Sequence, residues 1–434
     1  MNLLARLSFR KDRASTNGRS EDETAKNGRK QPEGKAPKGK APKKQQPSES
    51  FEMVKRRATV NLAILERPLM SSTEFIVDAR YRNMKLLDSG SYGIVVRAFD
   101  SKTKTAVAIK KIFSAFSCSR MARHVLREVR LLRHLDHPHI VKLLDIDVPG
   151  QYTAWQSVYI VTPLLEVDLY TAFRQGKVDD VLKQKKIAYQ LLLALEHMHS
   201  HGLMHRDIKS KNLLLDKDMN VQLCDLGESR FYSKANRDIL FEDELEDELE
   251  PQLSGVITTI LQSAPELVFG DEYDAEVDIW AAGCVIAEIV RPGHEYLFDS
   301  VAKHSHLQEI VDIIGYPTPD VAETIDKNAA WVLRRVRKSS GNRIADMLGP
   351  SVDQLAIDLV EKMLTFSPKQ RISATDALHH PWFDEARDET INNRGKYDFA
   401  QTEPSKKTPK SKLKRLVWDE IIGFHPEAAG MAVR

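Results

Sequence analysis

The chain of 434 residues has little cysteine and no long apolar run. Its three cysteines, Cys118, Cys224 and Cys284, are odd in number and widely spaced, which argues against a disulfide framework and predicts a reducing compartment, cytoplasmic or nuclear. No stretch approaches the roughly 20 apolar residues of a transmembrane helix, and Met1-Asn2 lacks the glycine that myristoylation requires. We therefore expect neither a transmembrane segment nor a myristoyl anchor.

A large net charge is also absent, because 64 basic and 62 acidic residues leave a sum of +2. This sum hides strong segregation: residues 1–57 are rich in Lys and Arg, whereas residues 242–250 are almost wholly acidic. Residues 10–50 have almost no large apolar side chain, so they cannot bury enough surface to offset the entropy of ordering. We expect a disordered basic tail over residues 1–74, with structure beginning near Phe75.

The rest of the chain carries patterns of regular structure. Five runs enriched in β-branched and aromatic residues predict strands, at 81–87, 93–99, 106–112, 140–145 and 158–162. Short polar links join the first three, which predicts an antiparallel meander. Apolar residues at helical spacing predict helices over 125–135 and 186–199. Two short apolar runs, 212–215 and 221–224, predict a hairpin.

Two polar motifs stand at the ends of this hairpin. The letters H-R-D-I-K-S-K-N begin at His205, and D-L-G begins at Asp225. They supply two carboxylates and a carboxamide that could meet at one phosphate group, which are the base and magnesium ligands that phosphoryl transfer needs. Either fragment alone is a weak signal, but both in this order and spacing leave little room for chance.

These motifs resemble the catalytic and magnesium loops of protein kinases. The resemblance implies a bilobal α+β fold, with a β-rich small lobe that contains one helix, a mainly helical large lobe, and ATP between them. It also implies that Asp207 accepts the proton of the acceptor hydroxyl, that Lys209 contacts the transferred phosphate, and that Asn212 and Asp225 hold Mg²⁺. The lysine two residues after Asp207 favours serine/threonine over tyrosine kinases.

The nucleotide motifs of the same family lie earlier in the chain. G-S-Y-G-I-V from Gly90 resembles the glycine-rich loop, V-A-I-K ends at Lys110, and Glu128 in the first predicted helix resembles the ion-pair partner of that lysine. Asp88 stands where the family usually has its first glycine, which predicts weaker ATP binding or altered loop mobility. The resemblance assigns to ATP the residues Leu87, Asp88, Ser89, Gly90, Ser91, Tyr92, Gly93, Ile94, Val95, Ala108, Lys110, Thr162 and Leu165.

The finer resemblance is to mitogen-activated protein kinases. L-E-V-D-L-Y from Leu165, L-V-E-K-M-L-T-F-S-P from Leu359 and an insert over 306–347 are similar to that family. A-P-E ends at Glu266, for which the resemblance names Arg371 as the partner. It implies a tail, a small lobe, a large lobe with the insert, and an extension that packs back on the small lobe, over residues 1–74, 75–163, 164–383 and 384–434.

The activation segment departs from that family. The positions of its activating T-x-Y fall on S-G-V from Ser254, so the tyrosine is missing. The arginines that usually meet phosphotyrosine fall on Ile260 and Ser263, which leaves a preference for proline after the acceptor residue open. Thr259 keeps the position that helps the catalytic base and its lysine hold their geometry.

The other half of the activation switch is retained. Arg127, Arg206 and Arg230 correspond to the family's cluster that grips phosphothreonine. An anion should sit at such a cluster, since each charge-assisted hydrogen bond is worth roughly 1.5–3 kcal/mol. Two candidates are phosphorylated Ser254 and the unmodified acids of residues 242–250, which would give activity without an upstream kinase. The alternative is a solvated acidic loop that does not dock.

Rival functions and partners stay open. A pseudokinase or scaffold is favoured by Asp88 and the altered activation segment but opposed by the retained charged site residues. Protein substrates are the expected partners; residues 55–62 resemble a docking peptide for this family, or are a solvated charge run, and an acidic docking patch is partly present at 384–389. Nucleic-acid tethering through the basic tail is a further alternative. The oligomeric state is left open.

Overall fold

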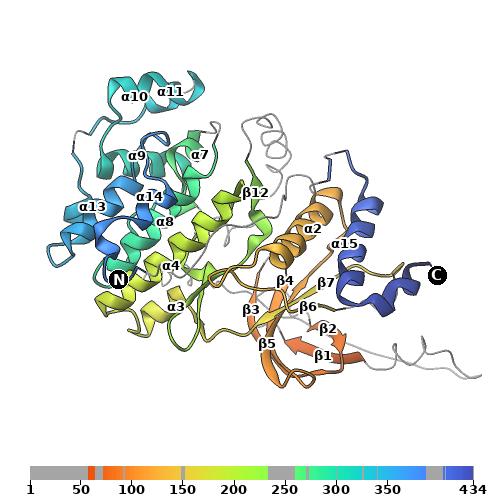
Figure 1. The fold of residues 1–434 in the computed structure, drawn as a ribbon. Coiled ribbons are helices and arrows are strands. Elements are labelled where there is room, and N and C mark those ends of the chain that lie inside the picture. Colours follow the sequence, from red (N-terminus) through yellow and green to blue (C-terminus); the bar gives the residue numbers. More distant parts are fainter. Residues whose placement is uncertain are drawn as a thin grey trace, which may run out of the picture. The chain divides into compact units, whose positions relative to one another are not determined.

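The computed structural model describes eleven stretches of the chain, residues 57–63, 72–90, 93–147, 152–232, 260–269, 273–300, 302–324, 327–339, 341–387, 404–405 and 407–433. All of them belong to one structural unit, Ser50–Arg434. The predicted disorder of residues 10–50 and the acidic run at 242–250 lie outside the described residues. The architecture is α+β, as predicted, with a sheet in the small lobe and mainly helices in the large lobe (Figure 1).

The small lobe is built on one antiparallel sheet whose strand order is β3-β4-β5-β7-β6. Its strands are β3 (Tyr81–Ser89), β4 (Gly93–Asp100), β5 (Thr105–Ile112), β6 (Asp145–Ile146) and β7 (Val158–Pro163). The expected meander and the strand at 158–162 are confirmed. The strand expected at 140–145 is wrong for most of its length, because Ile140 bridges to Leu223 of the large lobe instead of joining the sheet.

A second hairpin precedes this sheet. β1 (Arg57–Ala63) and β2 (Ser72–Asp78) pair antiparallel along their full lengths. Regular structure therefore begins before Phe75, earlier than expected. In β2, Phe75 and Val77 alternate into the small-lobe core, and the Phe75 ring lies edge-on to Tyr159 at 5.0 Å. Burial of these alternate residues ties the hairpin to the lobe.

Helix α2 (Ser119–His134) lies beside α15 (Lys410–Phe424) in Figure 1. It begins six residues before the predicted 125–135, because its polar first turns carry no apolar periodicity; Cys118 caps it by accepting the Met121 amide. Glu420 on α15 pairs with Arg130 and Arg133 on α2. The expectation that the C-terminal extension packs on the small lobe is confirmed.

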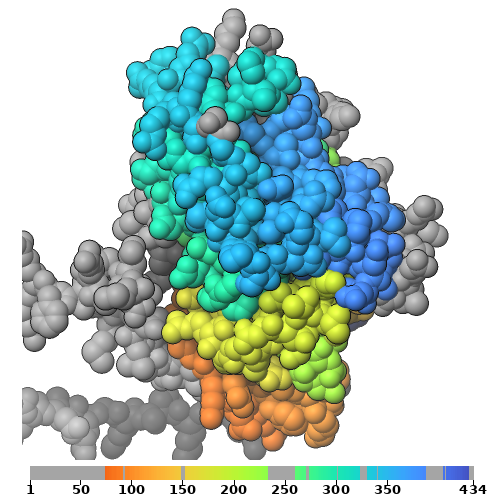
Figure 2. All heavy atoms as spheres, turned by 90° about the vertical axis from the view of Figure 1, so that its left-hand side faces the viewer, coloured from red at the N-terminus to blue at the C-terminus, as the bar shows by residue number. Residues whose placement is uncertain are grey.

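The large lobe is mainly helical. Its helices are α3 (Leu169–Arg174), α4 (Val181–Ser200), α7 (Pro265–Phe269), α8 (Glu276–Val290), α9 (Lys303–Ile314), α10 (Pro319–Thr324), α11 (Lys327–Leu333), α12 (Ile344–Leu348), α13 (Gln354–Met363) and α14 (Ala374–Leu378). In α8 every residue after the first is buried, as in a helix that is packed on all sides. In Figure 2 the segments coloured cyan to blue gather at one end, and the yellow segments separate them from the orange small lobe. Within the described ranges, none of the helices combines the length and the hydrophobicity of a transmembrane segment.

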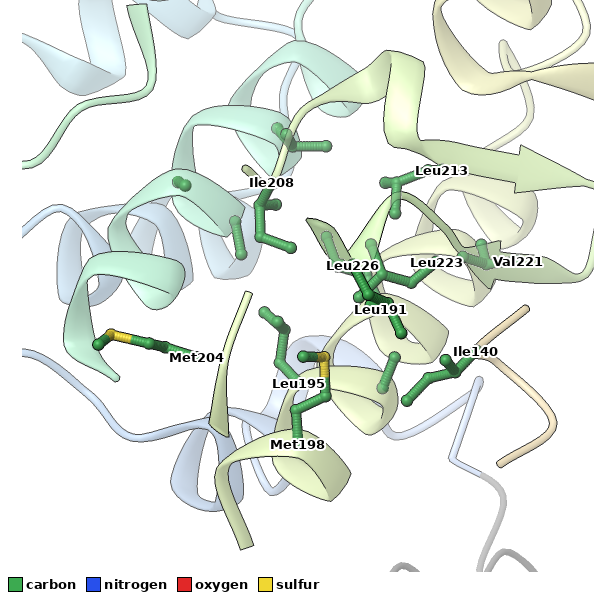
Figure 3. Packing of buried hydrophobic residues seen from close by; sticks show 14 of the residues in the cluster. Ile140, Leu191, Leu195, Met198, Met204, Ile208, Leu213, Val221, Leu223 and Leu226 are labelled. Carbon is green, nitrogen blue, oxygen red and sulfur yellow. The ribbon is translucent and has the colours of Figure 1, made fainter. Parts of the chain in front are cut away.

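The predicted hairpin is present as β10 (Leu213–Leu215) and β11 (Val221–Leu223). It packs on α4: Figure 3 shows Leu213, Val221 and Leu223 near α4 side chains such as Leu191. β9 (Leu203–Met204) and β12 (Arg230–Phe231) form a separate pair next to it. The amide of Cys224 donates to the carbonyl of Asn212 at 3.0 Å, so the two polar ends of the hairpin are held together.

Candidate active site

Lys110 lies between two carboxylates that come from different parts of the chain. Alternation along β5 buries Val107 and Ile109 on one face and turns Lys110 to the other. Lys110 Nζ donates to Glu128 Oε1 of α2 at 2.7 Å and to Asp225 Oδ1 at 2.8 Å. The Lys110 ammonium holds the pKa of Asp225 well below its usual range, and burial lowers the pKa of Lys110 less than the two carboxylates raise it.

Hydrogen bonds to Asp278 of α8 hold the loop after β9 in place. The Asp278 carboxylate accepts the amides of His205 and Arg206 at 2.7 and 2.8 Å and contacts His199 at 3.0 Å. These bonds hold Arg206 in the left-handed region, at φ 70°. His205 is fully buried; its Nδ1 accepts the Asp207 amide, so Nε2–H donates to the Cys224 carbonyl at 3.1 Å.

Asp207, Lys209 and Asn212 converge at the end of this loop. Lys209 Nζ lies 2.9 and 2.7 Å from the two carboxylate oxygens of Asp207. Asn212 Nδ2 donates to Asp207 Oδ2 and to the Asp207 carbonyl, each at 2.8 Å. The carboxylate is thus fixed in direction, beside a cation that could neutralise a phosphate, which suits a base for a hydroxyl group.

The donor atoms that remain fit a magnesium ion. The bonds above use Asp225 Oδ1 and Asn212 Nδ2, which leaves Asp225 Oδ2 and Asn212 Oδ1 as oxygens that could face a cation. In the part of the chain that is described, no three His, Cys, Asp or Glu side chains are arranged to hold a metal by themselves. One carboxylate and one amide suit Mg²⁺, which usually completes its octahedron with phosphate and water.

The residues assigned to ATP are partly brought together. Strand register pairs Val95 with Lys110 and Ala108 with Thr162, and all four are half-buried on neighbouring strands. The side chain of Ile94 instead lies in the small-lobe core on the other face of the sheet. Leu165 follows β7 and is half-buried. Ser91 and Tyr92 lie outside the described residues.

The glycine-rich loop begins at the end of β3. Gly90 donates its amide to the Gly93 carbonyl at 2.9 Å, and a side chain at Gly93 would collide with the carbonyl of Lys111. Leu87 is 49% exposed. The Asp88 carboxylate accepts the Ser89 amide at 2.8 Å, so it is turned onto its own backbone.

The three arginines of the expected phosphate cluster come from three elements. Arg127 lies on α2, Arg206 in the catalytic loop and Arg230 on β12. Burial, together with repulsion from Arg127 and Arg206, lowers the pKa of Arg230 to about 10, so the three cations act on one another. Ser254, Thr259 and the acids of 242–250 lie outside the described residues.

Sequence reasoning missed two acidic residues next to these sites. Glu228 lies between the arginine cluster and His124, and its only sequence signal is an acid three residues after the aspartate of D-L-G. Glu288 is buried below the catalytic loop, where it accepts the Ser210 hydroxyl at 3.2 Å. The mainly apolar sequence of α8 gives no signal for the role of Glu288.

The predicted pair of Arg371 and Glu266 is confirmed, at 2.7 and 3.1 Å. A family model of the protein kinase domain matches residues 81–383. The chain belongs to the protein kinase family. Its relatives include mitogen-activated protein kinase 6 of Arabidopsis thaliana, which is 33% identical and aligns over 81% of this chain and 85% of its own length. Mitogen-activated protein kinase hog1 of Blastobotrys adeninivorans is 32% identical over 83% of this chain and 84% of that protein.

Within the family, this chain is a mitogen-activated protein kinase, and it is an ATP-dependent protein serine/threonine kinase. Two acids of the expected docking patch of this kinase already have partners. Lys185 Nζ lies 2.7 Å from Glu385, and Arg387 lies 3.0 Å from Asp384. The rest of that patch, residues 388 and 389, lies outside the described residues.

Proposed function

We propose that the protein transfers the γ-phosphate of ATP to serine and threonine hydroxyls of protein substrates in signal transduction. The observation that supports this most is the convergence of Asp207, Lys209 and Asn212, with bonds of 2.7–2.9 Å. The Lys110–Glu128–Asp225 arrangement supplies a second set of charges for the nucleotide. All six residues lie in the part of the chain that the structure describes.

Each residue has a role that its contacts support. Asp207 takes the proton from the attacking hydroxyl, and its bond to Asn212 keeps the carboxylate oriented. Lys209 stabilises charge on the transferred phosphoryl group, whose bond to the ADP oxygen breaks as the bond to the substrate oxygen forms. Lys110 holds the α- and β-phosphates. Mg²⁺, when bound at Asn212 and Asp225, would neutralise phosphate charge.

The fine points of specificity and regulation belong to the same proposal. Either phosphorylated Ser254 or the acids of 242–250 supply an anion for the activation switch. Asp88 weakens ATP binding or alters the mobility of the glycine-rich loop, because it places a carboxylate near the nucleotide; this carboxylate accepts the Ser89 amide at 2.8 Å. The protein acts in the cytoplasm or nucleus. It docks basic partner peptides through those acidic residues of 384–389 that do not form ion pairs within the protein itself.

Phosphorylation of a generic basic protein by dephosphorylated enzyme with Mg-ATP tests the proposal. Asp207→Asn should lower the rate by about 10²–10⁴-fold, the usual contribution of a general base. Asp218→Asn is the matched control, since Asp218 is 63% exposed and pairs only loosely with Lys217 at 3.5 Å. It should retain the parent rate.

The same assay separates the rival functions. A parent that is active without phosphate, and less active when the acids of 242–250 are neutralised, is switched on by its own carboxylates. A parent that becomes active only after Ser254 is phosphorylated uses the phosphate switch. Silence in both states would overturn the proposal and leave a pseudokinase that binds partners without phosphoryl transfer.

A further inference from the structure

Helix α11 carries an exposed tryptophan near its C-terminal end. The side chain of Trp331 is 54% exposed, whereas the other four tryptophans of the chain are at most 4% exposed. The guanidinium carbon of Arg335 lies 3.5 Å from the centroid of the Trp331 ring. An arginine that stacks this closely on an aromatic ring presents a cation and an apolar surface together.

Three further cations lie in the same segment. Arg334, Arg337 and Lys338 are all exposed. Arg337 lies 3.1 Å from Asp312 of α9, and its side chain is still 78% exposed. Together with the stacked pair these cations form the insert patch, which consists of Trp331, Arg334, Arg335, Arg337 and Lys338. In the described part of the chain Asp312 compensates one of the four positive charges, so the field of the patch attracts anions.

The backbone under the insert patch is held in place by the large lobe. Leu333 and Val336 are buried in one cluster with residues of α9. The amide of Arg337 donates to Gln308 Oε1 at 2.8 Å, and Gln308 Nε2 donates to the Arg337 carbonyl at 3.1 Å. A preformed surface loses little conformational entropy on binding. Tryptophan and arginine on such a surface are typical of the residues that dominate protein–protein binding.

The acidic run, residues 242–250, has the complementary chemistry. Its letters E-D-E-L-E-D-E-L-E contain seven carboxylates, with Leu245 and Leu249 between them. A carboxylate can pair with an arginine through two parallel hydrogen bonds, and a leucine can bury apolar surface against an exposed indole ring. The run therefore offers both kinds of contact that the insert patch can make.

The acidic run can also reach the insert patch. Residues 233–259 lie outside the described residues, and the description resumes at Ile260, just before α7. Helix α7 packs against α9 and α11 (Figure 1), and its Phe269 contacts the cluster that contains Leu333. Ten residues separate the run from Ile260, and they span at most about 33–36 Å. So short a tether gives the run a high effective concentration at the patch.

We propose that the acidic run docks on the insert patch of the same chain, with its carboxylates on the arginines and its leucines on Trp331. The inference rests on the proposed kinase function for its regulatory consequence only. Acids that are held at the insert patch leave phosphorylated Ser254 as the anion of the activation switch.

Binding of a fluorescently labelled peptide of residues 238–252 to the full-length protein tests the docking without any turnover. The receptor is a variant in which the seven acids of the run are changed to Gln or Asn, so that its own run does not compete. Anisotropy should show saturable binding in low salt and a large loss at about 1 M salt, where the Debye length is about 3 Å. The parent chain should bind the peptide at least about 10-fold more weakly, because its own run occupies the patch.

Variants of this receptor identify the surface. Arg334→Gln combined with Arg335→Gln should raise the Kd for the peptide about 5- to 10-fold, as expected for two charge pairs at a surface. Trp331→Ala should raise it by a similar factor and leave the salt dependence in place. The matched control is Lys142→Gln combined with Lys217→Gln, which removes two charges from side chains that are 67% and 82% exposed and should leave the Kd unchanged.

Several outcomes would overturn the docking. They are the absence of saturable binding, equal Kd values for the patch and control variants, and equal Kd values for the parent and the receptor. Binding to vesicles rich in phosphatidylserine but not to the peptide would assign the patch to an anionic membrane instead. A parent dimer that the patch variant dissociates would place the run on a second copy and contradict docking within one chain.

The same measurements stay separate from the kinase function, because no ATP is present. A protein that shows the expected binding but transfers no phosphate keeps the docking and refutes the proposed function. An active kinase that does not bind the peptide keeps the function and refutes the docking.

Discussion

Helix α2 reaches into two charged regions of opposite character through adjacent residues, Glu128 and Arg127. In the first region, Lys110 is held by two carboxylates at 2.7 and 2.8 Å. In the second, Arg127, Arg206 and Arg230 repel one another, and the Glu228 carboxylate lies 4.0 Å from Arg230 and 3.8 Å from the imidazole of His124. The first region joins one cation to two carboxylates at hydrogen-bond distance, whereas in the second like charges repel one another and Glu228 approaches Arg230 only to 4.0 Å. The difference teaches that short bonds between opposite charges hold the first region together, whereas repulsion between like charges acts in the second.

Removing the cation of the first region should have the largest effect. Lys110→Met leaves Glu128, which is 2% exposed, and Asp225 without their counter-ion. We expect kcat/KM to fall by about 10²–10⁴-fold, because two charge-assisted hydrogen bonds of roughly 1.5–3 kcal/mol are lost. Phosphorylation of a generic basic protein with Mg-ATP measures this change. Lys142→Met, at a pair that is 67% and 86% exposed, is the control and should keep the parent rate.

Equal rates for Lys110→Met and Lys142→Met would contradict this prediction. They would mean that the short bonds of Lys110 stabilise the fold but do not contribute to catalysis. Unfolding in urea shows whether the lost activity comes with unfolded protein at the assay temperature.

Glu288 is a buried acid whose surroundings differ from those of the two carboxylates that pair with Lys110. Burial raises the pKa of Glu288 to about 8, and within the described residues no ion pair compensates its charge. Between about pH 4.5 and 8 the folded protein keeps a proton on Glu288 that the unfolded chain releases. The contribution of Glu288 should therefore lower the free energy of unfolding by about 1.4 kcal/mol for each unit that the pH rises in this window. Glu288→Gln should remove that slope.

Urea unfolding of parent and Glu288→Gln at pH 5, 6, 7 and 8 measures the slope. Glu295→Gln serves as control, because its side chain is 72% exposed and should leave the parent slope in place. Parallel stability curves for parent and Glu288→Gln would contradict the prediction.

The smallest effect is expected at the arginine cluster, where removing a cation should stabilise the protein. Burial and like charges cost Arg230 about 3 kcal/mol, as judged from its pKa of about 10, and its two hydrogen bonds to the Gly227 and Ser229 carbonyls return roughly 1 kcal/mol each. Arg230→Gln should raise the free energy of unfolding by about 1 kcal/mol in chloride, as measured by urea unfolding. Destabilisation instead would show that the cluster is fully neutralised.

Much of the active site could be predicted from short-range patterns. H-R-D-I-K-S-K-N and D-L-G place Asp207, Asn212 and Asp225 at the ends of one hairpin, so local chain geometry brings them together. The extra first turns of α2 could not be predicted, since Cys118 caps them without a periodic pattern. The missing part of the strand at 140–145 could not be predicted either, because Ile140 pairs with a residue more than 80 positions away.

The sequence by itself determined the family, the α+β class and the identity of the reacting side chains, because these depend on residue types at fixed spacing. Only the tertiary structure decided which charges face one another. Glu228 and Glu288 are ordinary acids in the sequence, and their surroundings come from α2, β12 and the catalytic loop. The physical reason is that burial and the approach of distant charges set the state of an ionisable group, and neither is a property of local sequence.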